Sequence, residues 1–255
     1  MTQGRYLVAG VREAGENIFV IRFLAPDLAA SIRAGHFLNI KVADGYDPLL
    51  RRPFSAYRTD DGNVEVIFNV VGKGTTLLSK KAAGDILDVL GPLGVPYSLD
   101  DPSFTTGLLV GGGLGVAPLP IATAGLRAAG KRVMTFLGGR TARQVVQEHL
   151  EHPLIATDDG SLGFKGTVVD LLRAELAKRE VPAPKIFACG PTPMLRAVAE
   201  FARSRGIPCE VSLEGPMACG IGICQGCPVE LMGPEKRYAL MCKDGPVFDI
   251  EKIRI

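Results

Sequence analysis

Four cysteines near the C-terminal end have types and a spacing that suit an iron–sulfur site. They follow a C-x4-C-x2-C pattern with a fourth thiol after 14 intervening residues, at Cys219, Cys224, Cys227 and Cys242. This is the spacing of a plant-type [2Fe-2S] site, in which four thiolates converge on one cluster and nearby backbone N–H groups donate to its sulfur atoms. Gly220, Gly222 and Gly226 permit the tight backbone curl that such a loop needs. The pattern therefore predicts a cluster-binding loop.

Two other uses of these thiols remain open at this point. A structural zinc site usually presents two short CxxC hairpins, whereas only Cys224 and Cys227 form such a pair here. A disulfide pair would suit a short, cysteine-dense secreted chain, and we expect no secretory leader in this sequence. The spacing favours the cluster over both alternatives.

Composition and charge set limits on the class of protein. A length of 255 residues is enough for two domains of ordinary size and a small further block. The formal net charge is only +2 and no basic cluster stands out, so we expect no nucleic-acid partner. The first 20 residues alternate and carry charges, which is unlike a signal peptide or a membrane span. We expect a cytoplasmic protein without membrane contact.

Residues 1 to about 100 have the pattern of short strands separated by turns. Candidate strands are Tyr6–Val11, Ile18–Leu24, Phe37–Val42 and Val64–Val71. In the last of these, Val64, Val66, Phe68 and Val70 alternate on one face, while Ile67 and Val71 make the other face apolar as well. A strand buried on both faces predicts a small closed antiparallel barrel that packs against a second layer.

From about Thr106 the pattern changes to alternating strands and helices. Apolar runs typical of strands alternate with a helix ending at Ala129, another starting at Ala142, one over Val168–Ala177 and one over Met194–Arg205. In the last helix the apolar face is formed by Leu195, Val198, Ala199 and Phe201. This alternation predicts βαβ units and a parallel sheet of Rossmann type. The strand CEVSLE then leads directly into the cysteine block.

Glycine-rich loops follow two of these strands. GGGLGVAP at residues 111–118 supplies Gly111, Gly112, Gly113 and Gly115, and ACGPTPML at residues 188–195 supplies Cys189, Gly190 and Pro191. Glycines let the backbone approach a pyrophosphate, and the carboxyl edge of an open α/β sheet is where such ligands bind. A third loop, Thr157–Gly166, ends another strand at the same edge. A glycine-rich turn without a ligand remains the simpler alternative for any one of these loops.

The strand-rich block carries two motifs that suit phosphate. The run RRPFSAY places Arg51 and Arg52 beside Ser55, and a guanidinium group binds phosphate through two parallel hydrogen bonds. The run VGKGTTLL then opens a glycine loop before a short helix expected over Thr75–Ala82. An ordinary strand with solvated arginines is the alternative for the first motif.

Together these motifs resemble the ferredoxin–NADP reductase-like flavoproteins over essentially the whole chain. Arg52-Pro53-Phe54-Ser55 resembles the flavin motif of that superfamily, and Gly72-Lys73-Gly74-Thr75 resembles its flavin pyrophosphate loop. The resemblance implies FAD bound by Arg52, Pro53, Phe54, Ser55, Ile67, Phe68, Asn69, Gly74 and Thr75, and NAD bound by the two glycine loops. Many members have an aromatic–Arg pair where this chain has Phe68-Asn69, so backbone contacts to the flavin are expected there.

The C-terminal block is similar to that of the electron-transfer subunits of NAD-dependent dihydroorotate dehydrogenase B. MACGIGICQGC and CKDGPVFD carry this resemblance. It implies an oxidoreductase subunit of pyrimidine biosynthesis that passes electrons from the FMN of a catalytic dihydroorotate dehydrogenase partner through [2Fe-2S] and FAD to NAD, in a heterotetramer with two copies of each subunit. The chain has no block that would bind dihydroorotate, so we expect no oxidation of dihydroorotate without the partner. We also expect no catalytic side chain, because hydride transfer is cofactor chemistry.

The expected fold is therefore multidomain, with β and α/β parts. Residues 1–100 form an FAD-binding antiparallel β-barrel, residues 101–212 an NAD-binding Rossmann-like parallel α/β domain, and residues 213–255 a small [2Fe-2S] domain. Cys209 is expected in the core, and His36, His149 and His152 are expected to be neither ligands nor catalysts. Cys189 has two interpretations, a thiol near the nicotinamide ring or a small buried residue that closes a strand.

Three questions stay open. The same cofactors would suit a reductase subunit of another complex, such as a bifurcating ferredoxin–NADP reductase or a sulfur-reducing hydrogenase. A non-catalytic module with zinc on the four cysteines is a more distant alternative. NAD is chosen over NADP from the resemblance alone, because no acidic residue ends the strand Val133–Leu137, and Arg140 and Arg143 could tolerate a 2′-phosphate.

Overall fold

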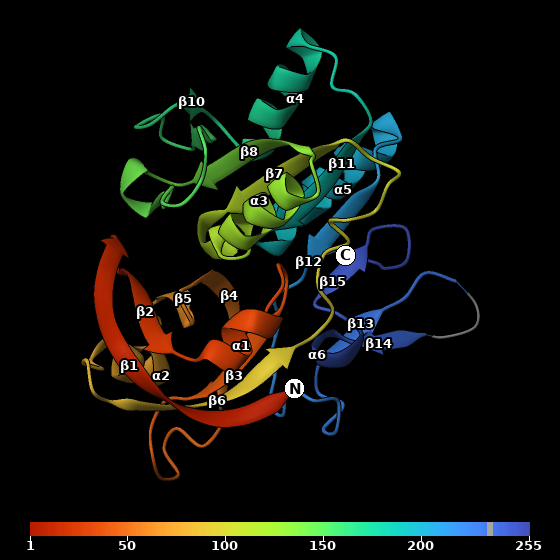
Figure 1. The fold of residues 1–255 in the computed structure, drawn as a ribbon. Helices are drawn as coiled ribbons and strands as arrows, with labels where there is room; N and C mark the ends of the chain where they lie inside the picture. The colour runs from red at the N-terminus through yellow and green to blue at the C-terminus, as the bar shows by residue number, and fades with distance from the viewer. Residues whose placement is uncertain (234–236) are drawn as a thin grey trace.

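The N-terminal strands close into a six-stranded antiparallel barrel. In the computed structural model, which describes residues 1–233 and 237–255, the barrel lies below the parallel sheet and beside the C-terminal block (Figure 1). Its strand order is β1-β2-β5-β4-β3-β6. The bounds are β1 (Thr2–Gly15), β2 (Ile18–Leu24), β3 (Phe37–Lys41), β4 (Arg52–Asp60), β5 (Asn63–Asn69) and β6 (Ile86–Leu93), with α1 (Pro26–Ser31) and α2 (Lys73–Ser79) between strands. The predicted barrel is confirmed.

Strand β5 shows why this barrel has two apolar layers. Val64, Val66 and Phe68 are at most 2% exposed, and Ile67 on the opposite face is 3% exposed. The predicted strand was too long, however, because Val71 lies beyond β5 and is 76% exposed. The expected helix over Thr75–Ala82 is shifted as well, since α2 begins at Lys73 and ends at Ser79.

The second part is a mostly parallel sheet with order β10-β9-β8-β7-β11-β12-β15. Its parallel strands are β7 (Thr106–Gly112), β8 (Arg132–Gly139), β9 (Leu154–Thr157), β10 (Phe164–Lys165), β11 (Pro184–Cys189) and β12 (Cys209–Ser212). The helices are α3 (Leu119–Ala128), α4 (Val168–Lys178) and α5 (Thr192–Arg205), with a 3-10 turn η1 (Gly113–Val116) after β7. After β7 the chain adds β8, β9 and β10 on one side of that strand, and it then adds β11 and β12 on the opposite side. The switch point where ligands bind in such sheets therefore lies between these two strands.

The helix expected from Ala142 is wrong. Only a 3-10 turn, η2 (Ala142–Gln144), forms there. The segment is held by contacts with the barrel, because Glu16 N–H donates to the Arg143 carbonyl at 3.0 Å and the Tyr57 hydroxyl donates to the Glu148 carbonyl at 3.2 Å. These tertiary contacts override the local helix preference.

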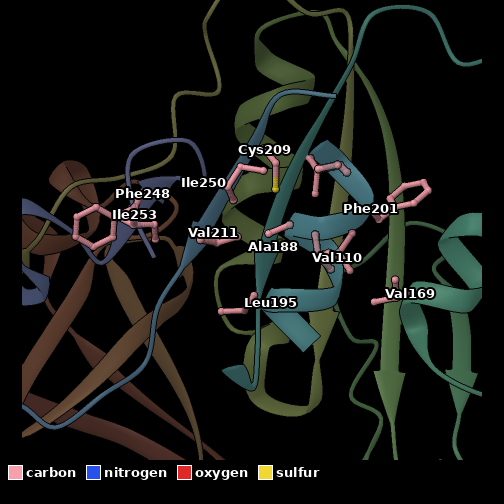
Figure 2. Close-up of a cluster of buried hydrophobic side chains, with 14 of the residues drawn as sticks. Val110, Val169, Ala188, Leu195, Phe201, Cys209, Val211, Phe248, Ile250 and Ile253 are labelled. Carbon is pink, nitrogen blue, oxygen red and sulfur yellow. The ribbon is translucent and has the colours of Figure 1, made fainter. Parts of the chain in front are cut away.

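The C-terminal block is joined to the parallel sheet rather than set apart from it. It contains β13 (Pro228–Glu230), β14 (Tyr238–Leu240), α6 (Met241–Asp244) and β15 (Val247–Asp249). Strand β15 pairs antiparallel with β12, so that Val211 faces Phe248. Figure 2 shows Phe248, Ile250 and Ile253 beside Val211, on the side of the sheet core that faces this block. The three-part division at residues 100 and 212 stays an interpretation, with β15 as the shared strand.

Among the described residues, no helix combines the length and the apolar character that crossing a bilayer requires.

His36 gives the fold a defined pH dependence. Its side chain is buried just before β3, and its Nδ1 accepts the Arg33 backbone N–H at 3.0 Å. Burial, and then the charge of Arg33, lower the pKa of His36 to about 4. An unfolded histidine has a pKa of about 6.5, so the unfolded chain binds more protons between these values. Stability from this group is therefore full above about pH 6.5 and is lost as pH falls toward 4.

We predict that the His36→Asn variant lacks the pH dependence of stability that His36 causes. The amide oxygen of the asparagine can still accept the Arg33 N–H. Urea unfolding between pH 7 and pH 4 should show the wild type losing up to about 3 kcal/mol more than the variant. The exposed His152→Asn is the matched control and should follow the wild type. Parallel pH profiles for wild type and His36→Asn would contradict the assignment.

Candidate cofactor sites

Eight of the nine predicted flavin residues line one cleft between the barrel and the parallel sheet, and Gly74 is the one that does not. This cleft has a volume of about 300 Å³. The predicted residues on its wall are Arg52, Pro53, Phe54, Ser55, Ile67, Phe68, Asn69 and Thr75. The opposite wall includes Leu114, Ser212, Glu214, Gly215 and Met217, which the sequence motifs did not indicate. The chain segment after β12 thus completes a site that the barrel begins.

The two neighbouring arginines have different roles. Arg51 binds the barrel itself, with its guanidinium 2.8 Å from the Asp88 carboxylate and 2.9 Å from the Asp88 carbonyl. Arg52 lines the cleft, and a side chain carbon at Gly74 would lie 3.1 Å from its Nε. Glycine at this position therefore leaves the guanidinium room beside the start of α2, as a phosphate cradle requires.

Thr75 and Phe68 line the flavin cleft and also make contacts within the protein. The Thr75 hydroxyl accepts the backbone N–H groups of Val71 at 2.9 Å and Gly72 at 3.2 Å, which fixes the glycine loop. Phe68 is 2% exposed and stacks on Phe19 with ring centroids 6.1 Å apart. It packs within the barrel and presents little of its ring to the cleft, as expected where backbone contacts dominate.

The two glycine loops of the parallel sheet meet at its switch point. A side chain carbon at Gly115 would lie 1.9 Å from the Cys189 carbonyl oxygen, so only glycine allows this approach. Gly190 has a φ of +153° and lies against the Gly112 backbone, with Gly111 buried in β7. Cys189 is 1% exposed, and burial, followed by the charge of Glu214, raises the pKa of its thiol. The protein therefore holds Cys189 as a neutral, packed thiol.

A chain of adjoining clefts leads from these loops to the flavin cleft. One cleft of about 380 Å³ is lined by Gly112, Gly113, Pro191, Arg140 and Asp158, together with the start of α4 and α5. A second, of about 700 Å³, shares Gly112, Gly113, Arg140 and Pro191 with the first and shares Asn69 and Glu214 with the flavin cleft. The cleft beside the glycine loops and the cleft lined by the flavin motif are therefore continuous. Arg143 lines neither of these clefts, and its guanidinium lies 3.7 Å from the carboxylate of Glu16, which lines the second.

Glu214 and Asp158 are the acidic residues that sequence reasoning missed. Glu214 follows β12 and lines both the flavin cleft and the cleft next to it. Burial raises the pKa of its carboxyl. Asp158 follows β9, and its backbone N–H donates to the Gly139 carbonyl at the end of β8 at 3.1 Å. Asp158 lies in the loop Thr157–Gly166, which the sequence predicts at this edge of the sheet, whereas Glu214 lies in the run CEVSLE, which it predicts as strand.

The four predicted cluster cysteines come together as two pairs of free thiols. The Sγ atoms of Cys227 and Cys242 lie 3.2 Å apart, well beyond the roughly 2.05 Å of a disulfide. In the other pair, the Cys224 backbone N–H donates to the Cys219 Sγ at 3.4 Å. No three of the described His, Cys, Asp and Glu side chains form a cage for one ion. The cysteine spacing, with Cys224 and Cys227 as its single CxxC pair, favours an iron–sulfur cluster over a structural zinc ion.

The pKa values of the thiols are consistent with a thiolate site. Burial opposes ionisation of Cys219, but the N–H groups of Cys224 and Ile221 lower its pKa to about 6. Burial and the neighbouring Cys227 thiol raise the pKa of Cys242 to about 12. The loop therefore favours the thiolate at Cys219, whereas the Cys242 thiol ionises readily only when a bound cation stabilises its thiolate. The residues fit the iron–sulfur group that their spacing predicts.

A hydrogen bond joins the cluster loop to the barrel. The Asn39 side-chain amide donates to the Cys219 carbonyl at 3.2 Å. Gly220 has a φ of +73°, and a side chain carbon there would lie 2.5 Å from the Asn39 amide nitrogen. Glycine at 220 is therefore required both by the turn and by the close approach.

Both the C-terminal block and the chain as a whole are similar to known proteins. Residues 214–254 match the family model described as the iron-sulfur cluster binding domain of dihydroorotate dehydrogenase B. The electron transfer subunit of dihydroorotate dehydrogenase B (NAD(+)) from Geobacillus thermodenitrificans strain NG80-2 is 41% identical, with 96% of this chain and 95% of that protein covered. The subunit of the same name from Bacillus pumilus strain SAFR-032 is 37% identical, with 100% and 99% covered.

Solved structures show the same architecture. The structure described as NADH-dependent reduced ferredoxin-NADP oxidoreductase, in a study of flavin-based electron bifurcation, superposes with a TM-score of 0.86 and 32% identity, covering 98% of this chain and 89% of that one. A ferredoxin NADP+ reductase from Neisseria gonorrhoeae with bound FAD and NADP gives a TM-score of 0.68 over 80% and 92% of the chains. At 14% identity the latter likeness concerns the fold alone.

We predict that Arg52→Ala weakens FAD binding by about 10- to 150-fold, because a charge-assisted hydrogen bond contributes roughly 1.5–3 kcal/mol. The measurement is fluorescence titration of the flavin-free protein with FAD. Arg58→Ala on the same strand removes a guanidinium that pairs with Asp60 at 3.1 Å, and it should leave the affinity unchanged. Equal affinities for the wild type and Arg52→Ala would show that the guanidinium does not contact the flavin phosphate.

Proposed function

The chain belongs to the family of dihydroorotate dehydrogenase B electron-transfer subunits, and from this membership we propose that it carries electrons between a catalytic partner and NAD. It is an oxidoreductase subunit with FAD and a [2Fe-2S] cluster as cofactors and NAD as co-substrate. Electrons pass from the FMN of a dihydroorotate-oxidising partner through the cluster and FAD to NAD+ in pyrimidine biosynthesis. The three-block division of the chain corresponds to these three sites.

The segment between β12 and the cluster loop is the observation that carries this proposal. Gly215 and Met217 line the flavin cleft, and Cys219 is the first cluster ligand. Two residues span at most about 7 Å of extended chain, so the flavin cleft and the cluster loop are direct neighbours. The same segment contributes Glu214 to the cleft that leads to the glycine loops. One stretch of chain therefore touches all three proposed sites.

Each group of residues has a separate task. Arg52, Ser55 and the loop at Gly74-Thr75 bind and orient the flavin, and Gly112, Gly113, Gly115 and Pro191 form the dinucleotide cradle. Cys219, Cys224, Cys227 and Cys242 hold the cluster. The flavin supplies exchange between two-electron hydride chemistry and single-electron transfer. Glu214 lines both the flavin cleft and the adjoining cleft, and burial there raises the pKa of its carboxyl.

The partner is proposed to dock over the cluster loop. Ile223 is 76% exposed and Cys224 beside it is exposed, so the loop presents an apolar tip next to a cluster ligand. The assembly with an FMN-containing catalytic subunit, two copies of each chain, is part of the proposal. A cytoplasmic location is proposed as well, because six free cysteines are typical of a reducing compartment.

A second candidate is the reductase subunit of an electron-bifurcating complex. The TM-score of 0.86 with the NADH-dependent reduced ferredoxin-NADP oxidoreductase favours it. Affinity purification of the tagged chain from its own host separates the two candidates. A stoichiometric partner that oxidises dihydroorotate supports the proposed function, and a larger flavin and iron–sulfur partner without this activity supports the second candidate.

We predict that Cys224→Ser abolishes dihydroorotate-dependent NAD+ reduction by the complex while NADH still reduces the FAD of the variant. The ligand lies in the C-terminal block, so the barrel and the glycine loops should remain folded. Stopped-flow absorbance with NADH measures the last step of the path, between FAD and NAD, in reverse, and steady-state NADH formation from dihydroorotate measures the whole path.

The core variant Cys209→Ala is the control, because it removes a buried thiol outside the cluster loop. It should keep full turnover and the full iron content. Full dihydroorotate-to-NAD turnover by Cys224→Ser would place the cluster outside the electron path, even with every cofactor bound.

A further inference from the structure

The outer face of the barrel carries a polar cleft that none of the proposed cofactors uses. The cleft has a volume of about 270 Å³ and lies over β1, β3 and β6, with the loop that follows α2 at its edge. Its wall includes three cations, Arg5, Lys41 and Lys81, which come from three different segments of the chain. Sites for drug-sized ligands have volumes of about 300–1,000 Å³, so this cleft suits a small and charged ligand.

The strand register gathers these cations around one residue of β6. Asp88 lies opposite Arg5 of β1 on one side and opposite Lys41 of β3 on the other. Residues that are directly opposite in antiparallel strands have Cβ atoms about 4.5–5.5 Å apart and share one face of the sheet. Lys81 reaches the same cleft from the loop between α2 and β6. Three positive charges therefore converge on one small space.

The two acids of the cleft balance little of this charge. The Asp88 carboxylate accepts the Arg51 guanidinium at 2.8 Å and the Gln3 amide at 3.0 Å, so a fourth cation already neutralises it. The Asp44 carboxylate lies 3.4 Å from the Lys41 ammonium, but the Asp44 side chain is 94% exposed. Exposed pairs of this kind contribute little to binding. The cleft therefore keeps a positive surplus that favours an anion.

Two of the cations have no partner of their own. Among the described residues, neither Arg5 nor Lys81 forms an ion pair or a side-chain hydrogen bond. Asp85 is close to Lys81 in the sequence, but its carboxylate accepts the Ala82 backbone N–H at 2.9 Å. Guanidinium and ammonium groups bind phosphate oxygens through charge-assisted hydrogen bonds. Ile86 lines the same cleft and is 42% exposed, so the wall also offers an apolar contact beside the charges.

We propose that this cleft binds the phosphate group of a small phosphorylated molecule. Arg5, Lys41 and Lys81 donate to the phosphate oxygens, and Ile86 contacts the uncharged part of the ligand. The cleft shares no lining residue with the flavin cleft or with the two clefts at the glycine loops. The site is therefore separate from the cofactor sites, and it does not depend on the proposed function.

The test uses ribose 5-phosphate as the probe and ribose as the matched compound without the phosphate. Isothermal titration is performed on the full chain with its FAD and cluster, saturated with NAD+, so that the other proposed phosphate sites are filled. Low ionic strength keeps the surface charges weakly screened. The wild type should bind ribose 5-phosphate with a dissociation constant below about 1 mM. Ribose should show no saturable binding.

The double variant Arg5→Gln/Lys81→Gln should bind ribose 5-phosphate at least about tenfold more weakly, because it lacks two charge-assisted hydrogen bonds. Lys80→Gln is the matched control, since Lys80 is exposed and adjacent in sequence but does not line the cleft. Its dissociation constant should stay within about twofold of the wild-type value. All variants should reduce FAD with NADH as the wild type does, which checks that they are folded.

Two results would overturn the site. One is the absence of saturable ribose 5-phosphate binding by the wild type, or equal binding of ribose. The other is an equal dissociation constant for the wild type and the double variant, which would place the phosphate elsewhere on the protein. Either result leaves NADH-dependent reduction of FAD unaffected. A wild-type protein whose FAD is not reduced by NADH would instead contradict the proposed function and leave the binding result intact.

Discussion

The pairing of β15 with β12 is the contact on which the arrangement of all three sites depends. Strand β12 ends at Ser212, whose neighbours line the flavin cleft, and β15 returns from the cluster loop to lie against it. The apolar core is continuous across this pair, from Leu108 of the parallel sheet to Met241 and Cys242 of the cluster block. Because these groups share one core, the cluster loop cannot shift relative to the nucleotide sheet without exposing buried apolar surface.

The barrel is attached to both of its neighbours at the same junction. The Tyr97 hydroxyl donates to the Ala188 carbonyl at 2.9 Å, next to the second glycine loop, and Val95 N–H donates to the Gly245 carbonyl at 2.6 Å. Asn39 then ties the barrel to the Cys219 carbonyl. The flavin cleft is therefore bounded by all three blocks. These hydrogen bonds hold the flavin cleft, the second glycine loop and the cluster loop next to one another.

Local sequence pattern predicts which helices and strands form better than it predicts which of them pack side by side. Strand β2 has the predicted bounds, and Leu195, Val198, Ala199 and Phe201 are buried as the periodicity of α5 indicates. Strand β15 is three residues long and has no local signature, so its pairing with β12 follows only from packing. Glu214 and Asp158 were missed because the clefts that they line form only where strands distant in the sequence lie side by side. The 3-10 turn and loop that follow Thr141 reflect contacts with the barrel that no local preference encodes.

The most direct test of the account is an anaerobic titration of the purified chain with NADH, without dye mediators, followed by visible absorbance and low-temperature EPR. The account predicts that the flavin absorbance bleaches and that the EPR signal of a reduced [2Fe-2S] cluster grows in the same protein, because the cluster loop adjoins the flavin cleft. A flavin that bleaches while the cluster is reduced only after a mediator is added would contradict a direct path between the two sites.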